Sequence, residues 1–181
     1  MMIRKQNIKR MRQKKLWYVI YTKSRSEKKL NLDLEEKGVE TYLPMKRELR
    51  VWSDRKKWVE TPLFPSYVFV RVSDKESHTA IDSQYAVCYV RIKGKPVAIR
   101  EKQIETLKLL VEDEQRNLEV TSETIETGKP VEVIAGPLKG VQGDVVERRG
   151  KHRLVLRFES LGACVLSEIG ISDIKLLEPC T

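Results

Sequence analysis

The sequence predicts an α+β protein with two domains: an N-terminal α/β sandwich and a small C-terminal β-barrel of five strands. The first 113 residues alternate short β-type segments with three helical ones, whereas residues 128 to 181 contain β-type segments alone. A polar stretch without hydrophobic periodicity, residues 114 to 127, separates them and predicts a linker, or at least a domain boundary. A chain of 181 residues is long enough for two small domains, each with its own core.

A basic arm, residues 1 to 15, precedes the first domain, which we place at 16 to 113; the second domain is 128 to 181. The arm holds seven basic residues and no acidic one, so the remaining residues carry only +2 of the net charge of +9. Such an arm either contacts nucleic acid through phosphate charge or is a solvated leader. Net charge therefore does not identify the folded part as a nucleic-acid binder.

The first elements of the N-terminal domain are a strand, a helix and a hairpin. Residues 17 to 21 are aromatic and β-branched and predict a buried strand. Ser24 and Glu27 have the capping-box spacing, and Gly38 is a C-terminal stop, so we expect a helix from about 25 to 37. Residues 39 to 50 are expected to be extended, and the polar residues 53 to 57, between two tryptophans, predict a hairpin tip.

The rest of this domain is predicted from alternation, capping and turn signals. Residues 62 to 72 form a β segment that is apolar on both faces and so needs cover on both sides. Ser73 and Glu76 predict a helix start, with the helix running to about Gln84. Strand-like segments flank a glycine turn at 93 to 95, and apolar residues at three- and four-residue steps predict an amphipathic helix from Glu101 to Glu112.

The C-terminal domain is predicted from five short β segments divided by glycine and charged turns. A closed barrel would remove the exposed edges of so short a sheet. The segments are residues 131–133, 141–147, 154–158, 163–166 and 171–177.

The sequence also argues against several classes of protein. It lacks the run of about 20 apolar residues that a membrane span needs. Three cysteines and two histidines show no metal-ligand spacing, and no phosphate-binding loop or nucleophile–base pair is recognisable. We therefore expect a cytoplasmic protein that does not contact membranes, carries no metal or cofactor, and has no catalytic residues.

Several motifs resemble the NusG family, whose members combine an NGN domain with a KOW domain. Residues 131 to 145, VEVIAGPLKGVQGDV, are similar to the KOW motif of small SH3-like barrels. WYVIYTK at 17 to 23, the helix after it, YLP at 42 to 44 and PLFPSYVFV at 62 to 70 resemble the NGN domain. The sequences of these segments are more similar to those of specialised members such as RfaH and the UpxY antiterminators than to that of housekeeping NusG. Ser66 stands where family proteins usually have glycine or asparagine.

The resemblance implies a binding site for RNA polymerase. An apolar, aromatic-lined surface of the NGN domain would dock on the β′ clamp helices; the matching positions are Trp17, Tyr67, Phe69 and Ile92. Aromatic residues suit an interface hot spot; the alternative is that some of them belong to the core. His78 and Thr79 match a motif that touches the β-subunit gate loop, or are ordinary surface residues.

Two further contacts are implied by the resemblance. Non-template DNA would meet basic residues at the end of the first strand and on the first helix, although a solvated helix face is the alternative: Lys23, Arg25, Lys28 and Lys29. Arg55, Lys56 and Lys57 could extend this track. In the barrel, the loop from Phe158 to Ala163, with Leu161 at its tip, would contact a ribosomal small-subunit protein or termination factor Rho.

The function implied is that of a monomeric, non-enzymatic transcription elongation and antitermination factor. It would close the polymerase clamp over DNA and suppress pausing or termination at particular operons, specifically surface-polysaccharide genes. A housekeeping NusG-type factor and a ribosome- or RNA-binding KOW protein are the alternatives.

Overall fold

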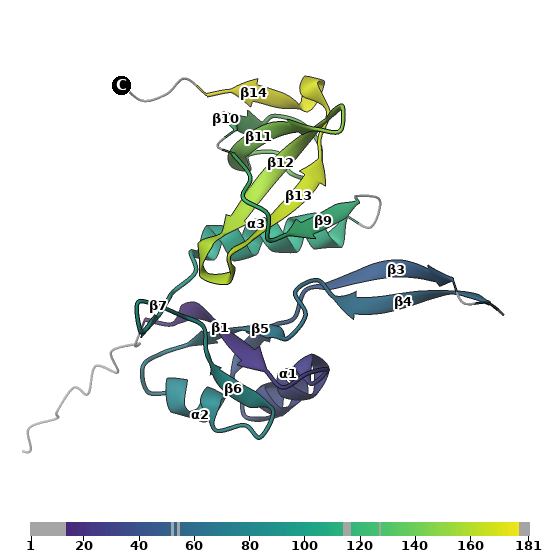
Figure 1. Cartoon of the computed structure of the whole chain (residues 1–181). Helices are drawn as coiled ribbons and strands as arrows, with labels where there is room; N and C mark the ends of the chain where they lie inside the picture. The colour runs from purple at the N-terminus through teal and green to yellow at the C-terminus, as the bar shows by residue number, and fades with distance from the viewer. Residues whose placement is uncertain (1–13, 52, 54, 114–116, 127, 178–181) are drawn as a thin grey trace, which may run out of the picture.

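The computed structural model describes residues 14–51, 53, 55–113, 117–126 and 128–177, which form an N-terminal α/β domain and a C-terminal β domain (Figure 1). The predicted arm thus lies outside the described residues except for Lys14 and Lys15. The N-terminal elements, in chain order, are β1 (Leu16–Thr22), α1 (Glu27–Glu36), β2 (Glu40–Tyr42), β3 (Met45–Val51), β4 (Lys56–Pro62), β5 (Tyr67–Val72), α2 (Ser77–Ile81), β6 (Ala86–Tyr89), β7 (Arg91–Ile92), β8 (Lys95–Pro96) and α3 (Glu101–Glu112).

An antiparallel sheet in the order β2-β5-β1-β6 forms the centre of the N-terminal domain. The three valines of β5 are buried on one face, against Leu30 and Leu34 of α1. Phe69 of β5 lies on the other face, in a cluster with residues of α3. The prediction that β5 needs cover on both faces is therefore confirmed.

The start of α1 differs from the predicted capping box. The helix begins at Glu27, after Arg25 in a left-handed conformation (φ 54°), and Ser24 caps nothing. The Glu27 carboxylate instead accepts a hydrogen bond from the Ser66 backbone N–H at 2.7 Å. The capping-box prediction at Ser24 is wrong because the Glu27 carboxylate is hydrogen-bonded to Ser66, in a turn distant in the sequence, and not to the Ser24 backbone. The predicted stop is present, with Gly38 at φ 73°.

The second capping prediction is confirmed only in the contact of Glu76 with the Ser73 backbone; helix α2 begins at Ser77, its N-cap is Glu76, and the Ser73 hydroxyl donates to Glu76 instead of accepting from a backbone N–H. The Glu76 carboxylate accepts from the Ser73 backbone N–H at 3.0 Å and from its hydroxyl at 2.9 Å. Lys15 donates to the same carboxylate at 2.6 Å. The helix ends at Ile81, not near Gln84, because a turn at Ser83 follows, in which its carbonyl accepts from the Ala86 N–H.

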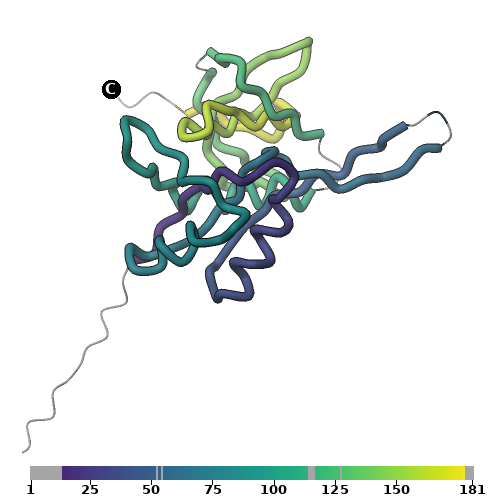
Figure 2. Tube along the Cα trace, turned by 60° about the horizontal axis from the view of Figure 1, so that its bottom comes forward, coloured from purple at the N-terminus to yellow at the C-terminus, as the bar shows by residue number. Residues whose placement is uncertain are grey.

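Two hairpins extend from this sheet. Strands β3 and β4 pair from Met45↔Pro62 to Val51↔Lys56 and project from the domain as a long arm (Figure 2). Trp52 and Asp54, at the predicted tip, lie outside the described residues. The β7–β8 turn contains Lys93 and Gly94, both at positive φ, as a tight two-residue hairpin turn requires.

The C-terminal domain is a sheet of six strands among the described residues, in the order β14-β10-β11-β12-β13-β9. Its elements are β9 (Leu118–Thr121), β10 (Lys129–Val133), β11 (Gln142–Arg148), β12 (Lys151–Phe158), η1 (Glu159–Leu161), β13 (Ala163–Glu168), η2 (Ile171–Asp173) and β14 (Ile174–Leu176). All five predicted strands are present, the last shortened by η2. The sixth, β9, lies within the predicted linker and pairs with β13.

Strand β9 was missed because it is short: Leu118 and Val120, which pack against the main hydrophobic cluster, are too few to show an apolar period. Ion pairs and hydrogen bonds add to its ladder with β13. The guanidinium of Arg153 lies 2.6 Å from the Glu119 carboxylate, and Arg148 lies 2.8 Å from that of Glu123. Arg157 donates to the backbone carbonyls of Ile125 and Glu126, both at 2.8 Å. The part of the predicted linker that the structure describes is thus attached to the C-terminal sheet.

One hydrophobic cluster joins the two domains. It contains buried side chains of β1, β5 and α3 together with residues of β10, β11, β12 and β13. In Figure 1, α3 lies directly beneath strands β12 and β13. Within the described residues, no helix is long and apolar enough to cross a bilayer.

Candidate functional site

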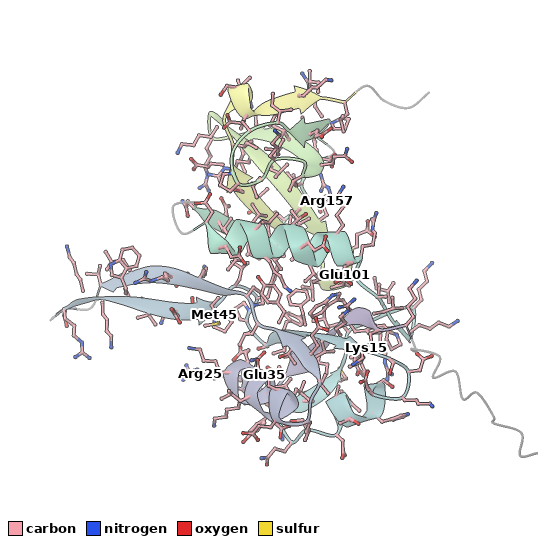
Figure 3. All side chains as sticks on the ribbon, turned by 180° about the vertical axis from the view of Figure 1, so that it is seen from behind. Lys15, Arg25, Glu35, Met45, Glu101 and Arg157 are labelled. Atoms are coloured by element: carbon pink, nitrogen blue, oxygen red, sulfur yellow. The ribbon has the colours of Figure 1, made fainter. Side chains whose placement is uncertain are left out.

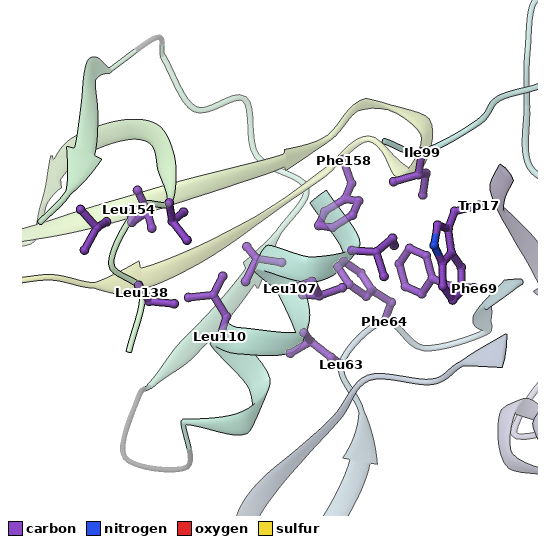
Figure 4. Close-up of a cluster of buried hydrophobic side chains, with 14 of the residues drawn as sticks. Trp17, Leu63, Phe64, Phe69, Ile99, Leu107, Leu110, Leu138, Leu154 and Phe158 are labelled. Carbon is purple, nitrogen blue, oxygen red and sulfur yellow. The ribbon is translucent and has the colours of Figure 1, made fainter. Parts of the chain in front are cut away.

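Three phenylalanines meet where the domains touch. Phe64 precedes β5, Phe69 is within it, and Phe158 ends β12 of the C-terminal domain. Their ring centroids are 5.4 Å (64–158), 5.8 Å (69–158) and 5.7 Å (64–69) apart, in edge-on or tilted geometries (Figure 4). We call these three residues the aromatic junction. Such ring pairs contribute about 0.5–1.5 kcal/mol each beyond their burial.

Helix α3 extends this contact with aliphatic side chains. Leu107 and Leu110 are fully buried and lie between the C-terminal Leu138 and Leu154 and the phenylalanines of the N-terminal domain (Figure 4). A polar contact adds to it, since the Gln103 side-chain amide donates to the Arg157 carbonyl at 2.8 Å. The C-terminal domain therefore covers an apolar face of the N-terminal domain.

The structure places two of the predicted polymerase-contact residues inside this cluster. Phe69 is 0% exposed and lies against Phe158, so the C-terminal domain is part of its cover. Trp17 is 1% exposed; its indole N–H donates to the Glu101 carboxylate at 3.1 Å, and the Lys108 ammonium lies 5.5 Å from its ring. Because Glu101 and Lys108 belong to α3, Trp17 is covered by its own domain. This agrees with the alternative that Trp17 is a core residue.

Tyr67 and Tyr42 lie at the edge of the same cluster. Tyr67 is half-buried, with its ring 5.5 Å from that of the exposed Tyr21. Tyr42 packs 6.2 Å from Phe69, and the Lys108 ammonium lies 5.3 Å from its ring. Burial, with the nearby Glu112 carboxylate, raises the pKa of the Tyr42 phenol above its usual value. Tyr42 is therefore neutral at physiological pH.

The remaining predicted polymerase contacts are on the surface. His78 and Thr79 lie on α2, both exposed, and Ala80 beside them packs into the cluster on the opposite face of the sheet. Ile92, in β7, is 40% exposed. The structure thus groups Tyr67 with Phe69 and leaves His78, Thr79 and Ile92 outside that cluster.

Phe64 and Phe158 are the residues that sequence reasoning missed. Phe64 lies within the PLFPSYVFV segment, but the resemblance implies no contact for it. From the sequence, Phe158 is the last residue of a barrel strand and the first of the contact loop. Its position at the end of an apolar alternation gives no sign that it would face another domain.

The predicted loop for Rho or a ribosomal protein also lies at the junction. It begins at Phe158, continues as η1 and turns at Gly162, and Leu161 is half-buried and packed against the shared cluster. The loop is therefore in contact with the N-terminal domain rather than free in solvent.

The predicted DNA-contact residues lie together on the surface. Lys23 and Arg25 follow β1, and Lys28 and Lys29 are in the first turn of α1; all four are exposed. The Lys29 ammonium lies 6.0 Å from the centre of the Tyr85 ring. In the part of the chain that the structure describes, no group of three or more His, Cys, Asp or Glu side chains is placed to hold a metal ion.

An antiparallel α/β sandwich joined to a small β domain is the two-domain architecture of the NGN–KOW class. The family model described as "Transcription termination factor nusG" matches residues 15–108, which is more than half of the chain. The protein belongs to the NusG family, whose members are transcription factors that bind RNA polymerase rather than enzymes.

Individual relatives are similar over most of the chain. The transcription termination/antitermination protein NusG of Rickettsia conorii is 25% identical over 173 residues, covering 89% of this chain and 90% of the relative. That of Bacillus subtilis is 26% identical over 147 residues, covering 74% and 81%. A solved structure titled "Domain interaction in Thermotoga maritima NusG" is 22% identical, with a TM-score of 0.48, and covers 91% of this chain and 98% of that one.

Proposed function

We propose that this protein is a transcription elongation and antitermination factor that binds RNA polymerase through the apolar face now covered by its C-terminal domain. The observation that supports this most strongly is the aromatic junction. Phe64 and Phe69 are paired with a ring from a separate domain, so a partner could replace that ring without unfolding either core. The partner surface would be the β′ clamp helices, with Tyr67 at the edge of the contact.

A covered face lowers the apparent affinity for polymerase. If only a fraction of molecules is open, the apparent Kd equals the intrinsic Kd divided by that fraction. A junction open in about one molecule in 100 would weaken binding 100-fold until a second ligand opens it. A factor of this kind acts where that ligand is present, which supports an operon-specific role over a housekeeping one, at surface-polysaccharide genes in our proposal.

Exposed residues of the N-terminal domain are candidates for binding the ligand that opens the junction. Lys23, Arg25, Lys28 and Lys29 would contact exposed non-template DNA through phosphate charge. His78, Thr79 and Ile92 are exposed and available to the β subunit, with the gate loop as the proposed contact of His78 and Thr79.

Opening would also free the contact loop of the C-terminal domain. Phe158 and Leu161 pack on the N-terminal domain, so the loop cannot offer both to Rho or to a ribosomal small-subunit protein while the junction is closed. We propose that polymerase binding and recruitment through this loop occur together, because one movement exposes both surfaces.

Single-round transcription with purified polymerase tests the proposal. Adding the protein to a template with a defined pause and terminator should shorten the pause and increase read-through, and Tyr67→Ala should weaken the effect while the thermal unfolding transition stays near that of the wild type. The proposal would be refuted if the protein did not co-elute with transcribing polymerase, whichever template is used.

A transcript profile after deletion separates the specific role from the housekeeping alternative. A change in transcript levels confined to one long operon supports the specific role, and a change in many operons supports a general NusG-type role. Sedimentation with ribosomes in the absence of any polymerase binding would instead support the ribosome-associated alternative.

A further inference from the structure

The segment that joins the domains lies across the C-terminal sheet. Residues 118 to 126 begin with β9, which pairs with β13. Further along the segment, Ile125 packs against a small buried cluster that contains Val155 and Cys164. Because the side chains of a strand alternate between the two faces of a sheet, this cluster lies on the face opposite Phe158 and the aromatic junction. We call residues 118 to 126 the strap.

Arginine side chains of the sheet bind the strap. The Arg157 guanidinium donates to two successive backbone carbonyls of the strap, both at 2.8 Å, and its Nε lies 3.4 Å from the Asp144 carboxylate. The buried Arg153 guanidinium lies 2.6 Å from the Glu119 carboxylate. A planar guanidinium holds two acceptors in a fixed geometry that a lysine ammonium does not reproduce.

Arg157 also takes part in the contact between the domains. Its backbone carbonyl accepts from the Gln103 side chain at 2.8 Å, and Figure 3 shows Arg157 on the sheet above Glu101, at the start of α3. The next residue along the strand is Phe158 of the aromatic junction. Neighbouring residues of one strand therefore bind the strap and the N-terminal domain.

The strap shortens the tether between the domains. While β9 is paired, residues 113 to 117 alone join α3 to the C-terminal sheet, and an extended chain of that length spans at most about 18 Å. With the strap released, residues 113 to 128 join α3 to β10 and can span about 55 Å. The effective concentration of one domain at the other falls roughly as the −3/2 power of the tether length, so release lowers it about fivefold.

We propose that the strap restrains the opening of the two domains, and that its release exposes Cys164 and increases the population of open molecules. Release is local, because the other five strands of the sheet pair without β9 and the strap contributes few partly buried aliphatic side chains: Leu118, Val120 and Ile125. The inference rests on the proposed function only in that opening uncovers the polymerase-binding face, and it is tested without polymerase.

Alkylation of the full-length chain with iodoacetamide, followed by mass spectrometry, tests whether the strap covers Cys164. Cys88 is exposed and is the internal reference, and Cys164 should react far more slowly. Arg157→Lys should raise the rate at Cys164 about tenfold, which is within the range for losing hydrogen bonds to a charged group. Ile125→Ala should also raise it, whereas Thr124→Ala, an exposed residue of the strap, is the matched control and should stay within twofold.

Urea distinguishes release of the strap from unfolding of the domain. Release exposes little surface, so the rate at Cys164 should hardly change up to about 1 M urea, whereas a reaction through global unfolding accelerates with urea. A rate at Cys164 that is the same in Ile125→Ala and the wild type, or one that follows global unfolding, would overturn the proposal.

Hydrogen–deuterium exchange at residues 63–69 tests whether the strap restrains the domains. Inserting about ten glycine and serine residues after Asn117 lengthens the tether and leaves the strap in place, so exchange at 63–69 should rise about fivefold while Cys164 stays protected. Ile125→Ala should raise both exchange and alkylation. Unchanged exchange in the insertion variant would overturn the restraint. Failure to bind polymerase would instead refute the proposed function and leave both of these results standing.

Discussion

Shortening Phe158 to alanine should open the two domains. The side chain is 1% exposed and its ring faces both Phe64 and Phe69, so Phe158→Ala removes two of the three ring contacts of the aromatic junction. Phe→Ala changes in buried sites cost about 3–5 kcal/mol. Part of that cost falls on the C-terminal domain itself, because the shared cluster that contains Phe158 also includes buried residues of strands β10, β11 and β13.

The part of this free-energy cost that is lost from the contact between the domains determines the population of open molecules. If a third to a half of the cost is lost from the docked state, the loss is about 1–2.5 kcal/mol, and every 1.4 kcal/mol is tenfold in an equilibrium. The open fraction should therefore rise about 5- to 60-fold. Apparent affinity for RNA polymerase should rise by the same factor until the open state dominates.

Titration of labelled core polymerase with each variant measures this directly. Val155→Ala is the control, since Val155 is buried in a separate cluster of the C-terminal domain. The substitution loosens the packing of that domain without removing an atom from the aromatic junction. Circular dichroism should show that both variants remain folded. If Phe158→Ala binds polymerase no more tightly than Val155→Ala does, the C-terminal domain does not occlude the polymerase-binding face and our reasoning fails.

Three further predictions concern stability. Ser66 has φ 67°, a conformation that costs a non-glycine residue about 1–2 kcal/mol, so Ser66→Gly should raise the unfolding midpoint in a thermal melt, and a lowered midpoint would contradict this. A Cβ on Gly128 would lie 2.3 Å from the Val145 carbonyl oxygen, so Gly128→Ala should cost about 1–3 kcal/mol in urea unfolding; an unchanged midpoint would show that the backbone yields freely. Hydrogen bonds from Lys15 and then Ser73 lower the pKa of Glu76, so its contribution is present above the unfolded-state pKa and is lost as pH falls through the folded pKa. The stability difference between wild type and Glu76→Gln should therefore be largest near neutral pH and shrink in acid; a difference independent of pH would exclude the mechanism.

The elements of the fold were readable from the sequence where local signals were strong. Helix α3 has the predicted bounds, Glu101–Glu112, and the apolar faces of β5 are buried as its alternation indicated. Strand β9 was not readable because its two apolar residues, Leu118 and Val120, are too few to show a period and its ladder partner β13 is distant in the sequence. The capping box at Ser24 failed because Ser66, about 40 residues away, binds the Glu27 carboxylate.

The candidate site was readable in part. Phe69 and Tyr67 were named from the resemblance, and both belong to or border the cluster that joins the domains. The contact of Phe158 with Phe64 was not readable, because the period of a strand shows which residues face inward but not which domain they meet. The packing of Ile125 on the other face of the C-terminal sheet likewise depends on how the strap crosses that sheet.

Hydrogen–deuterium exchange of the full chain, alone and bound to core RNA polymerase, tests most directly whether polymerase takes the place of the C-terminal domain. In the free protein, amides of residues 63–69 and 156–162 should both be protected. On binding, 63–69 should stay protected under the new partner, while 156–162 should exchange faster because the loop is released. Binding of polymerase with slow exchange retained at 156–162 would show that the domains stay closed and would contradict the account.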